Sequence, residues 1–174
     1  MKNKSLDIAS SVEWIKSGKI LVHPTEGIWG LGCDAFNEDA VNKIFKIKRR
    51  SKNKSFILLS ESLDFLKKYI QDLNKEDEKF LENYWPGPVT FLIKYNQKLP
   101  KHLHTENEKI AVRVSNHLPI KSLLKQFSGL MVSTSSNISG GGVIQDPIKI
   151  LKFFESNDLA YSVSYTHLTL PTTR

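Results

Sequence analysis

The order of short apolar runs and amphipathic stretches is the feature that most limits the folds open to this 174-residue chain. Short apolar runs rich in Val, Ile and Leu predict strands, whereas stretches with apolar residues every three or four positions predict helices. The two kinds of segment alternate along the chain, with no internal repeat, low-complexity tract or interior linker. This alternation predicts one α/β domain built on a twisted mixed sheet flanked by helices.

The predicted elements follow from apolar period and from start and stop residues. Asn37 is predicted to cap the second helix and Pro147 to begin the last one, while Gly18 stops the first. Strands are predicted at 19–23, 55–59, 89–95, 110–115 and 129–135, and helices at 8–17, 37–50, 61–70, 75–84, 117–127 and 146–156.

Composition narrows the class of protein. The hydrophobic share of 40% and charged share of 25% are those of an ordinary globular domain. No apolar run approaches the roughly 20 residues that span a bilayer, and the N-terminus has no signal-peptide core. We therefore expect a cytoplasmic protein without a membrane partner. The single cysteine, Cys33, excludes an intramolecular disulfide and a CxxC zinc site, and we expect it to be a small buried apolar residue.

The charge balance favours partners that carry phosphate. The formal net charge is +7 and the isoelectric point is about 9.4. A basic protein attracts nucleotides and RNA alike. Composition therefore leaves both classes of partner open.

A glycine-rich segment, "HPTEGIWGLGCDA", follows the first predicted strand at residues 23–35. Thr25 comes just past the carboxyl end of that strand, where open α/β sheets tend to place ligands. Spacing alone favours a simpler interpretation, a glycine-rich turn that leads into another strand. No Walker A lysine follows, so the segment is not a P-loop.

The basic stretch "KRRSKNK" at residues 48–54 allows two interpretations. Its cations can be solvated side chains that complement the end of the second helix. Alternatively, Lys48, Arg50 and Lys54 converge on one phosphate group, the arginine as a bidentate donor and the lysines as point charges. The stretch alone does not choose between them.

Two further segments place polar groups on predicted strands. Arg113 has apolar neighbours in "AVRVS", and a buried guanidinium needs either an internal carboxylate or the carboxylate of a ligand. We favour the ligand. Hydroxyl and amide groups in "VSTSSNISG" (132–140) can bind phosphate, Mg²⁺ or an amino acid, although such segments are also common turns.

No metal site is predicted from the histidines. His102 and His104 lie in a polar loop, and no acidic or cysteine partner stands at ligand spacing.

The chain resembles the YrdC/TsaC family of L-threonylcarbamoyl-adenylate synthases from about residue 5 to about 162. Five matching motifs occur in the family's order: "PTEGIWGLG" (24–32), Lys-x-Arg at Lys48 and Arg50, "WPGPVTF" (85–91), "VRV" (112–114) and "STSSN" (133–137). The resemblance implies a YrdC-like α/β domain around a basic cavity. It also implies a nucleotidyltransferase that combines ATP, L-threonine and bicarbonate into threonylcarbamoyl-AMP and pyrophosphate.

The resemblance assigns roles only where residues match. Lys48 and Arg50 are the implied catalytic residues. The implied ATP-binding residues are Lys48, Arg50, Lys54, Ser135 and Asn137, and the implied threonine-binding residues are Thr25, Arg113 and Ser133. Mg²⁺ is the implied cofactor beside ATP. Transferase proteins then pass the threonylcarbamoyl group to the adenosine beside the anticodon of tRNAs that read ANN codons, and tRNA itself is a further expected partner.

The chain departs from the family pattern at several positions. Ser51 stands where a proline often follows the motif arginine, Gly27 and Trp29 alter the first segment, Ser136 replaces a common alanine, and Leu59 stands where some relatives carry a histidine. We expect these changes to tune the pocket rather than abolish it.

The C-terminal end is predicted to differ more. A Pro-Ser-Thr-Ile-like segment of the family is not found, so residues 1–162 are predicted to be a YrdC-like domain truncated at its C-terminal end. Residues 163–174 are predicted to be a non-native read-through tail, since "VSYTHLTLPT" is similar to a translated sequencing adapter. An ordinary polar tail is the alternative.

Other functions remain open at this stage. The chain can be a non-catalytic RNA-binding or tRNA-binding module, for which the basic balance speaks, or an inactive truncated fragment. The carbamoyl-transferring YrdC-like domain of hydrogenase maturation proteins ranks third, because those chains also carry zinc-finger and acylphosphatase segments.

Overall fold

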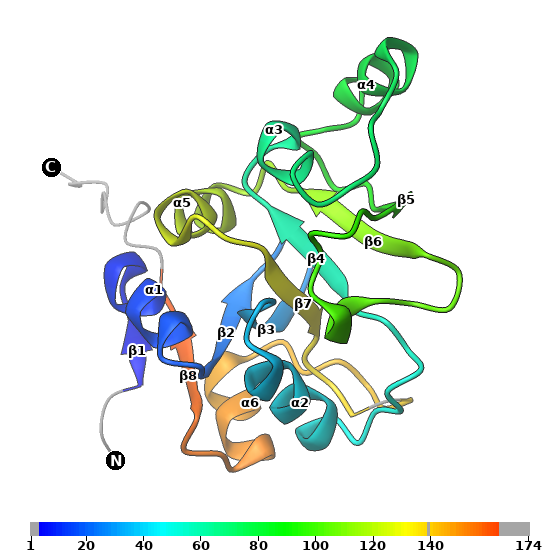
Figure 1. Cartoon of the computed structure of the whole chain (residues 1–174). Helices are drawn as coiled ribbons and strands as arrows, with labels where there is room; N and C mark the ends of the chain where they lie inside the picture. Colours follow the sequence, from blue (N-terminus) through cyan, green and yellow to red (C-terminus); the bar gives the residue numbers. More distant parts are fainter. Residues whose placement is uncertain (1–3, 139, 164–174) are drawn as a thin grey trace, which may run out of the picture.

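One mixed sheet organises the described residues, 4–138 and 140–163, of the computed structural model (Figure 1). Its strand order is β1-β8-β2-β3-β7-β4-β6-β5. The strands are β1 (Ser5–Leu6), β2 (Ile20–Pro24), β3 (Trp29–Asp34), β4 (Ile57–Ser60), β5 (Phe91–Lys94), β6 (Lys109–Val114), β7 (Met131–Ser135) and β8 (Leu159–Ser162). β8 lies parallel to β1 and β2, and β4 lies parallel to β6, whereas the other neighbouring pairs are antiparallel. The predicted mixed sheet is confirmed.

Helices cover both faces of this sheet. They are α1 (Ile8–Lys16), α2 (Glu38–Ile47), α3 (Leu63–Leu66), α4 (Lys75–Glu82), α5 (Leu118–Phe127) and α6 (Pro147–Phe154), with a 3₁₀ turn η1 (Lys101–Leu103). None of the helices in the described ranges is long and apolar enough to cross a membrane.

Local signals explain the helix ends. The Asn37 side chain accepts a hydrogen bond from the Ala40 N–H at 3.0 Å, which confirms the predicted cap of α2. Pro147 begins α6 behind an Asp146 cap. After α1, Gly18 adopts a φ of +78°, a left-handed conformation that favours glycine and ends the helix.

The predicted helix at 61–70 is much shorter in the structure, because the chain leaves the helix and pairs with a segment distant in sequence. After Leu66 the chain turns, and the Asn96 N–H donates to the Tyr69 carbonyl at 2.9 Å. The Asn96 amide also donates to the Ile70 carbonyl at 2.7 Å, and Ile70 is buried. Ile70 also pairs with Tyr95 as an isolated antiparallel bridge, so the chain is no longer helical there.

Three strands were not predicted as such: β1, β8 and, except as the strand after a glycine-rich turn, β3. β1 and β8 pair with each other far apart in sequence, so no local pattern marks them. Within the predicted tail, the Val163 N–H donates to the Leu6 carbonyl at 2.7 Å. The rest of that tail, 164–174, lies outside the described residues.

Two apolar clusters lie on opposite faces of the sheet. On one face, Ile20, Val22 and Leu31 pack with residues of α2 and α6. Cys33 belongs to this cluster and is buried, which confirms the expectation for it. Burial also raises the pKa of its thiol.

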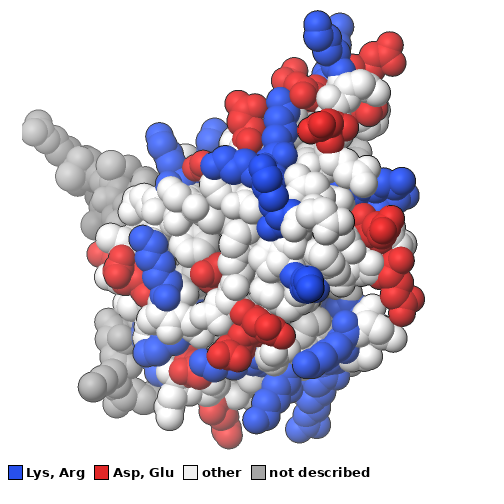
Figure 2. Space-filling view, in the orientation of Figure 1, with Lys and Arg blue, Asp and Glu red and all other residues white. Residues whose placement is uncertain are grey.

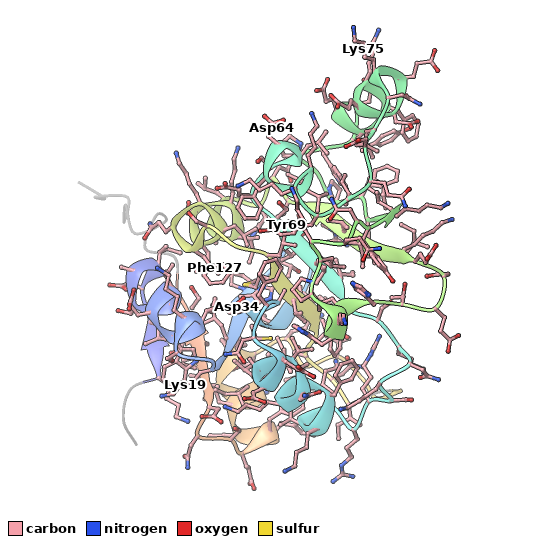
Figure 3. All side chains as sticks on the ribbon, in the orientation of Figure 1. Lys19, Asp34, Asp64, Tyr69, Lys75 and Phe127 are labelled. Carbon is pink, nitrogen blue, oxygen red and sulfur yellow. The ribbon has the colours of Figure 1, made fainter. Side chains whose placement is uncertain are left out.

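On the opposite face, Leu21, Leu59 and Met131 pack with α1 and α5, which lie side by side in Figure 1. Phe127, labelled in Figure 3, belongs to this second cluster at the end of α5. Alternation along β2 and β7 places His23 and Ser133 on the same face as this cluster, two residues beyond Leu21 and Met131. The buried polar side chains of His23 and Ser133 therefore lie on the sheet face beside the α1/α5 cluster.

Candidate active site

A cavity of about 310 Å³ opens on this face of the sheet. Its walls come from β3, β7, β4 and β6, from the turn after β2 and from the segment after α2. Five of the eight predicted site residues line it: Thr25, Arg50, Arg113, Ser133 and Ser135. Four segments far apart in the sequence thus meet at one place.

Arg113 comes from β6, and its guanidinium has internal partners. Its Nε donates to the Thr90 hydroxyl at 3.0 Å, and its Nη1 lies 3.4 Å from a Glu26 carboxylate oxygen. The sequence left open whether Arg113 pairs with an internal carboxylate, and in the structure it pairs with Glu26. A guanidinium carries five N–H donors, more than these two contacts use, so a ligand carboxylate can still be bound.

Glu26 is a site residue that the sequence did not predict. Its carboxylate accepts a hydrogen bond from the Ser115 hydroxyl in addition to the Arg113 contact. Burial opposes its ionisation, but the bond from Ser115 and the charge of Arg113 outweigh it, so the pKa of Glu26 lies below its ordinary value. The glutamate is an anion that holds Arg113 in place. Its position inside the segment "PTEG" was the signal in the sequence that could have identified it.

Thr25 shapes the turn at the cavity edge. Its N–H donates to the Ile28 carbonyl at 3.0 Å, and its hydroxyl oxygen accepts from the Ile28 N–H at 3.2 Å. The hydroxyl also donates to the same carbonyl. The segment is therefore the glycine-rich turn before a strand that spacing favoured, and Thr25 also borders the cavity as the resemblance implied.

Arg50 reaches the cavity because of the way α2 ends. Arg49 has a φ of +49°, and the Arg50 N–H donates to the Phe45 carbonyl at 3.0 Å, which closes the helix and turns the chain. The Arg50 guanidinium donates to the Ser55 carbonyl at 2.8 Å and lies 5.0 Å from the Phe56 ring centroid. Desolvation lowers the pKa of Arg50, which remains charged. Arg49 instead borders a cavity on another side.

Lys48 is not a solvated cation. It is only 1% exposed, and its ammonium donates to the Ser135 carbonyl and lies 3.5 Å from the Asn137 side-chain oxygen. Desolvation, with a smaller contribution from Arg50, lowers its pKa to about 8. The Ser135 hydroxyl in turn donates to Asn137, whose amide donates to the Gly141 carbonyl at 2.8 Å.

The predicted convergence of three cations on one point is therefore not what the structure shows. Arg50 lines the cavity, Lys48 lies behind Ser135, and Lys54 is exposed and does not line the cavity. The reason is the turn after α2, which sends successive side chains in different directions. The interpretation of 48–54 as wholly solvated is wrong for Lys48, since a buried ammonium cannot be part of a surface stripe.

His23 lies beneath the cavity and is fully buried. Its Nε2 is 3.4 Å from the Ser133 hydroxyl oxygen, and its Nδ1 is 3.2 Å from the Pro24 carbonyl oxygen. Desolvation dominates and lowers the pKa of His23 to about 4, so the imidazole is neutral at neutral pH. Nothing in the sequence marked His23, which reads as one more strand residue.

His102 and His104 have structural roles. A ring nitrogen of His102 lies 2.7 Å from the Ala35 carbonyl oxygen, and one of His104 lies 2.8 Å from that of Leu99. Among residues 4–138 and 140–163, no group of three or more His, Cys, Asp or Glu side chains could hold a metal ion.

A second cavity of about 440 Å³ adjoins the candidate site. The two share Ser55 and Phe56, and the second is also bordered by Lys52 and Lys109. Its other lining residues include Val41, Leu58 and Ile110 of the first apolar cluster, so it opens on the opposite face of the sheet.

Cations and anions alternate over much of the face drawn in Figure 2, with a denser group of Lys and Arg at its lower edge.

Comparison with known proteins supports the family that the order of motifs indicated. The family model named for Sua5, YciO and YrdC, described as "Telomere recombination", matches residues 13–168. The threonylcarbamoyl-AMP synthase of Saccharophagus degradans is 35% identical over 155 residues, which cover 89% of this chain and 81% of that protein.

Solved structures show the same fold. The crystal structure of P. abyssi Sua5 complexed with L-threonine matches with a TM-score of 0.82 at 24% identity, over 92% of this chain and 49% of that one. E. coli YciO matches with a TM-score of 0.78 at 24% identity, over 91% of this chain and 81% of that one. The predicted fold class is confirmed.

Proposed function

Because the chain belongs to the Sua5/YciO/YrdC family, we propose that it is a threonylcarbamoyl-AMP synthase whose active site is the cavity between β3, β7, β4 and β6. The enzyme uses ATP, L-threonine and bicarbonate and releases pyrophosphate, and its product serves tRNA threonylcarbamoylation. One observation carries the assignment of the site. Residues predicted separately from the sequence line one cavity on one face of the sheet.

The chemistry requires an amino acid that is held by its carboxylate. The threonine amine attacks the carbon of bicarbonate or CO₂, and a C–N bond forms to give a carbamate. With bicarbonate, water leaves. Arg113 is the group suited to the carboxylate, because a guanidinium binds one bidentately. Thr25 and Ser133 supply hydroxyls for the side-chain hydroxyl of threonine. The amine then remains free to react.

The second step is a transfer at phosphorus. A carbamate oxygen attacks the α-phosphorus of ATP, the bond to the bridging oxygen of the β-phosphate breaks, and pyrophosphate leaves with that oxygen. Negative charge on the phosphate oxygens is stabilised by positioned cations, which supply most of the catalysis in such transfers. Arg50 lines the cavity for this role. Lys48 and Lys54 do not line the cavity, so they add positive charge to this subsite from outside it, Lys48 from behind Ser135 and Lys54 from the exposed loop.

We expect Mg²⁺ to be part of the substrate and not a resident ion of the protein. Glu26, the carboxylate that pairs with the cavity residue Arg113, is already engaged by Arg113 and Ser115. The hydroxyls of Ser133 and Ser135 alone do not make a resident magnesium cage, since Mg²⁺ prefers carboxylate and phosphate oxygens and retains water. An Mg²⁺ ion would arrive on the triphosphate of ATP.

The product is expected to pass to tRNA-modifying transferase proteins, which place the threonylcarbamoyl group beside the anticodon of tRNAs that read ANN codons. An RNA-binding module is less well supported, because Lys48 of the basic stretch is buried.

The test is pyrophosphate release from Mg-ATP, with threonine and bicarbonate each supplied or withheld. Release that requires both supports the proposal, and a folded preparation that releases none refutes it. Arg50→Gln should lower kcat/KM by roughly 10- to 100-fold, the cost of a lost charge-assisted hydrogen bond. Arg49→Gln removes the same charge one residue away, on the side of another cavity, and should leave the rate within about twofold.

A further inference from the structure

The hydrogen-bond partners of His23 determine which of its nitrogens carries the proton. A neutral imidazole has one N–H group and one bare nitrogen. The Pro24 carbonyl oxygen, 3.2 Å from Nδ1, can only accept. The N–H therefore belongs on Nδ1, because a bare Nδ1 would place two lone pairs against each other. Nε2 is then an acceptor.

This tautomer fixes the direction of the bond to Ser133. With Nε2 bare, the contact at 3.4 Å can form only if the Ser133 hydroxyl donates its proton to the ring. The serine oxygen keeps its lone pairs for other partners, and Ser133 lines the cavity. Toward the cavity, Ser133 is then a hydrogen-bond acceptor and not a donor.

Glycines on β3 make this arrangement possible. His23 is on β2 and Ser133 is on β7, with β3 between them. A Cβ added at Gly30 would lie 3.1 Å from a ring carbon of His23, and one added at Gly32 would lie 3.0 Å from its Nε2. The imidazole spans the middle strand because positions 30 and 32 of that strand carry no side chain on this face. Gly30 and Gly32 thus have a role beyond backbone freedom.

We propose that His23 is a positioning residue: by accepting the Ser133 proton at Nε2, it turns the serine lone pairs toward the threonine subsite. The inference rests on the proposed function. The subsite then has a hydrogen-bond donor at one end, Arg113, which can only donate, and a hydrogen-bond acceptor at the other end, Ser133. Threonine fits in one orientation, with its carboxylate at Arg113 and its hydroxyl hydrogen at Ser133, which leaves the amine free. His23 itself does not touch the substrate.

The tautomer can be measured on the unsubstituted protein. ¹⁵N NMR of the histidine side chains at neutral pH should show His23 neutral, protonated at Nδ1 and bare at Nε2. A proton on Nε2, or a charged ring, would overturn the inference. This measurement does not depend on whether any variant folds, nor on activity.

The role is tested by threonine affinity, measured by calorimetry. His23→Phe keeps an aromatic ring but cannot accept, so the Ser133 hydroxyl is no longer oriented. Threonine affinity should fall about three- to tenfold, the size of one neutral hydrogen bond, while ATP affinity stays the same. In a Ser133→Ala background, His23→Phe should cause no further fall, because it acts through that hydroxyl. An equal fall in both backgrounds would mean a merely structural role.

Val22→Ala is the matched control. Val22 neighbours His23 on β2, is fully buried and points to the opposite face of the sheet. It should lower thermal stability without changing threonine affinity. If it lowers threonine affinity as much as His23→Phe does, general loosening of the sheet explains both and the inference fails. If the unsubstituted protein binds no threonine, the proposed function itself is refuted. Normal binding that His23→Phe leaves unchanged refutes only the role of His23.

Discussion

ATP affinity should depend on pH through Lys48. Its ammonium is buried against the Ser135 carbonyl and Asn137, next to the proposed phosphate subsite. Desolvation and the nearby Arg50 lower its pKa to about 8, so the charge is lost as pH rises through that value. An exposed lysine would stay charged to a pH about two units higher.

The size of the effect follows from this pKa. With a pKa of about 8, the protonated fraction of Lys48 falls about tenfold between pH 7 and pH 9. If only the charged form binds the triphosphate well, affinity should fall by about the same factor over this window. The phosphates of ATP titrate below it, with a pKa near 6, and do not interfere. The same shift predicts that the contribution of Lys48 to the free energy of unfolding rises with pH between about 8 and 10.5, because the unfolded chain then binds the extra proton.

The assay is calorimetric binding of a non-hydrolysable ATP analogue with Mg²⁺, without threonine, so that the amine of the amino acid does not titrate in the same experiment. Lys48→Arg is the matched control, since a guanidinium stays charged throughout the window and its affinity should be flat. Lys48→Met should bind weakly at every pH. A flat profile for the unsubstituted protein, or a fall that persists unchanged in Lys48→Arg, would refute the role given to this ammonium.

Three further outcomes are expected. Arg113→Gln should raise KM for threonine by roughly 10- to 100-fold with KM for ATP little changed, as steady-state kinetics will show, because it removes a charged donor; an unchanged KM would place the carboxylate elsewhere. Gly32→Ala should destabilise the protein by about 1–3 kcal/mol in urea unfolding, because its new methyl would lie 2.8 Å from the Val132 carbonyl oxygen. Gly27→Ala meets nothing within 4 Å and should change stability by less than about 1 kcal/mol, so equal effects of the two substitutions would contradict the packing argument. Cys33 is buried and its pKa is raised, so it should react with a thiol reagent only after denaturation; rapid labelling of the folded protein would contradict this.

The sequence by itself determined the class of fold and most of the elements. Apolar period and capping residues are local properties, which is why α2 with its Asn37 cap was predicted closely. The short pair β1 and β8 was missed, since its pairing is between the two ends of the chain. The helix predicted at 61–70 is short because the chain at Ile70 pairs with Tyr95, which is distant in sequence.

Motif order was enough to indicate the family and to name five residues that meet in one cavity. The role of each of them stays a prediction. Sequence reasoning could not show that Lys48 is buried, that Glu26 holds Arg113, or that a histidine lies under Ser133. Burial, charge partner and tautomer depend on which strands become neighbours. That neighbour relation is set by the order of strands in the sheet, which only the tertiary structure decides.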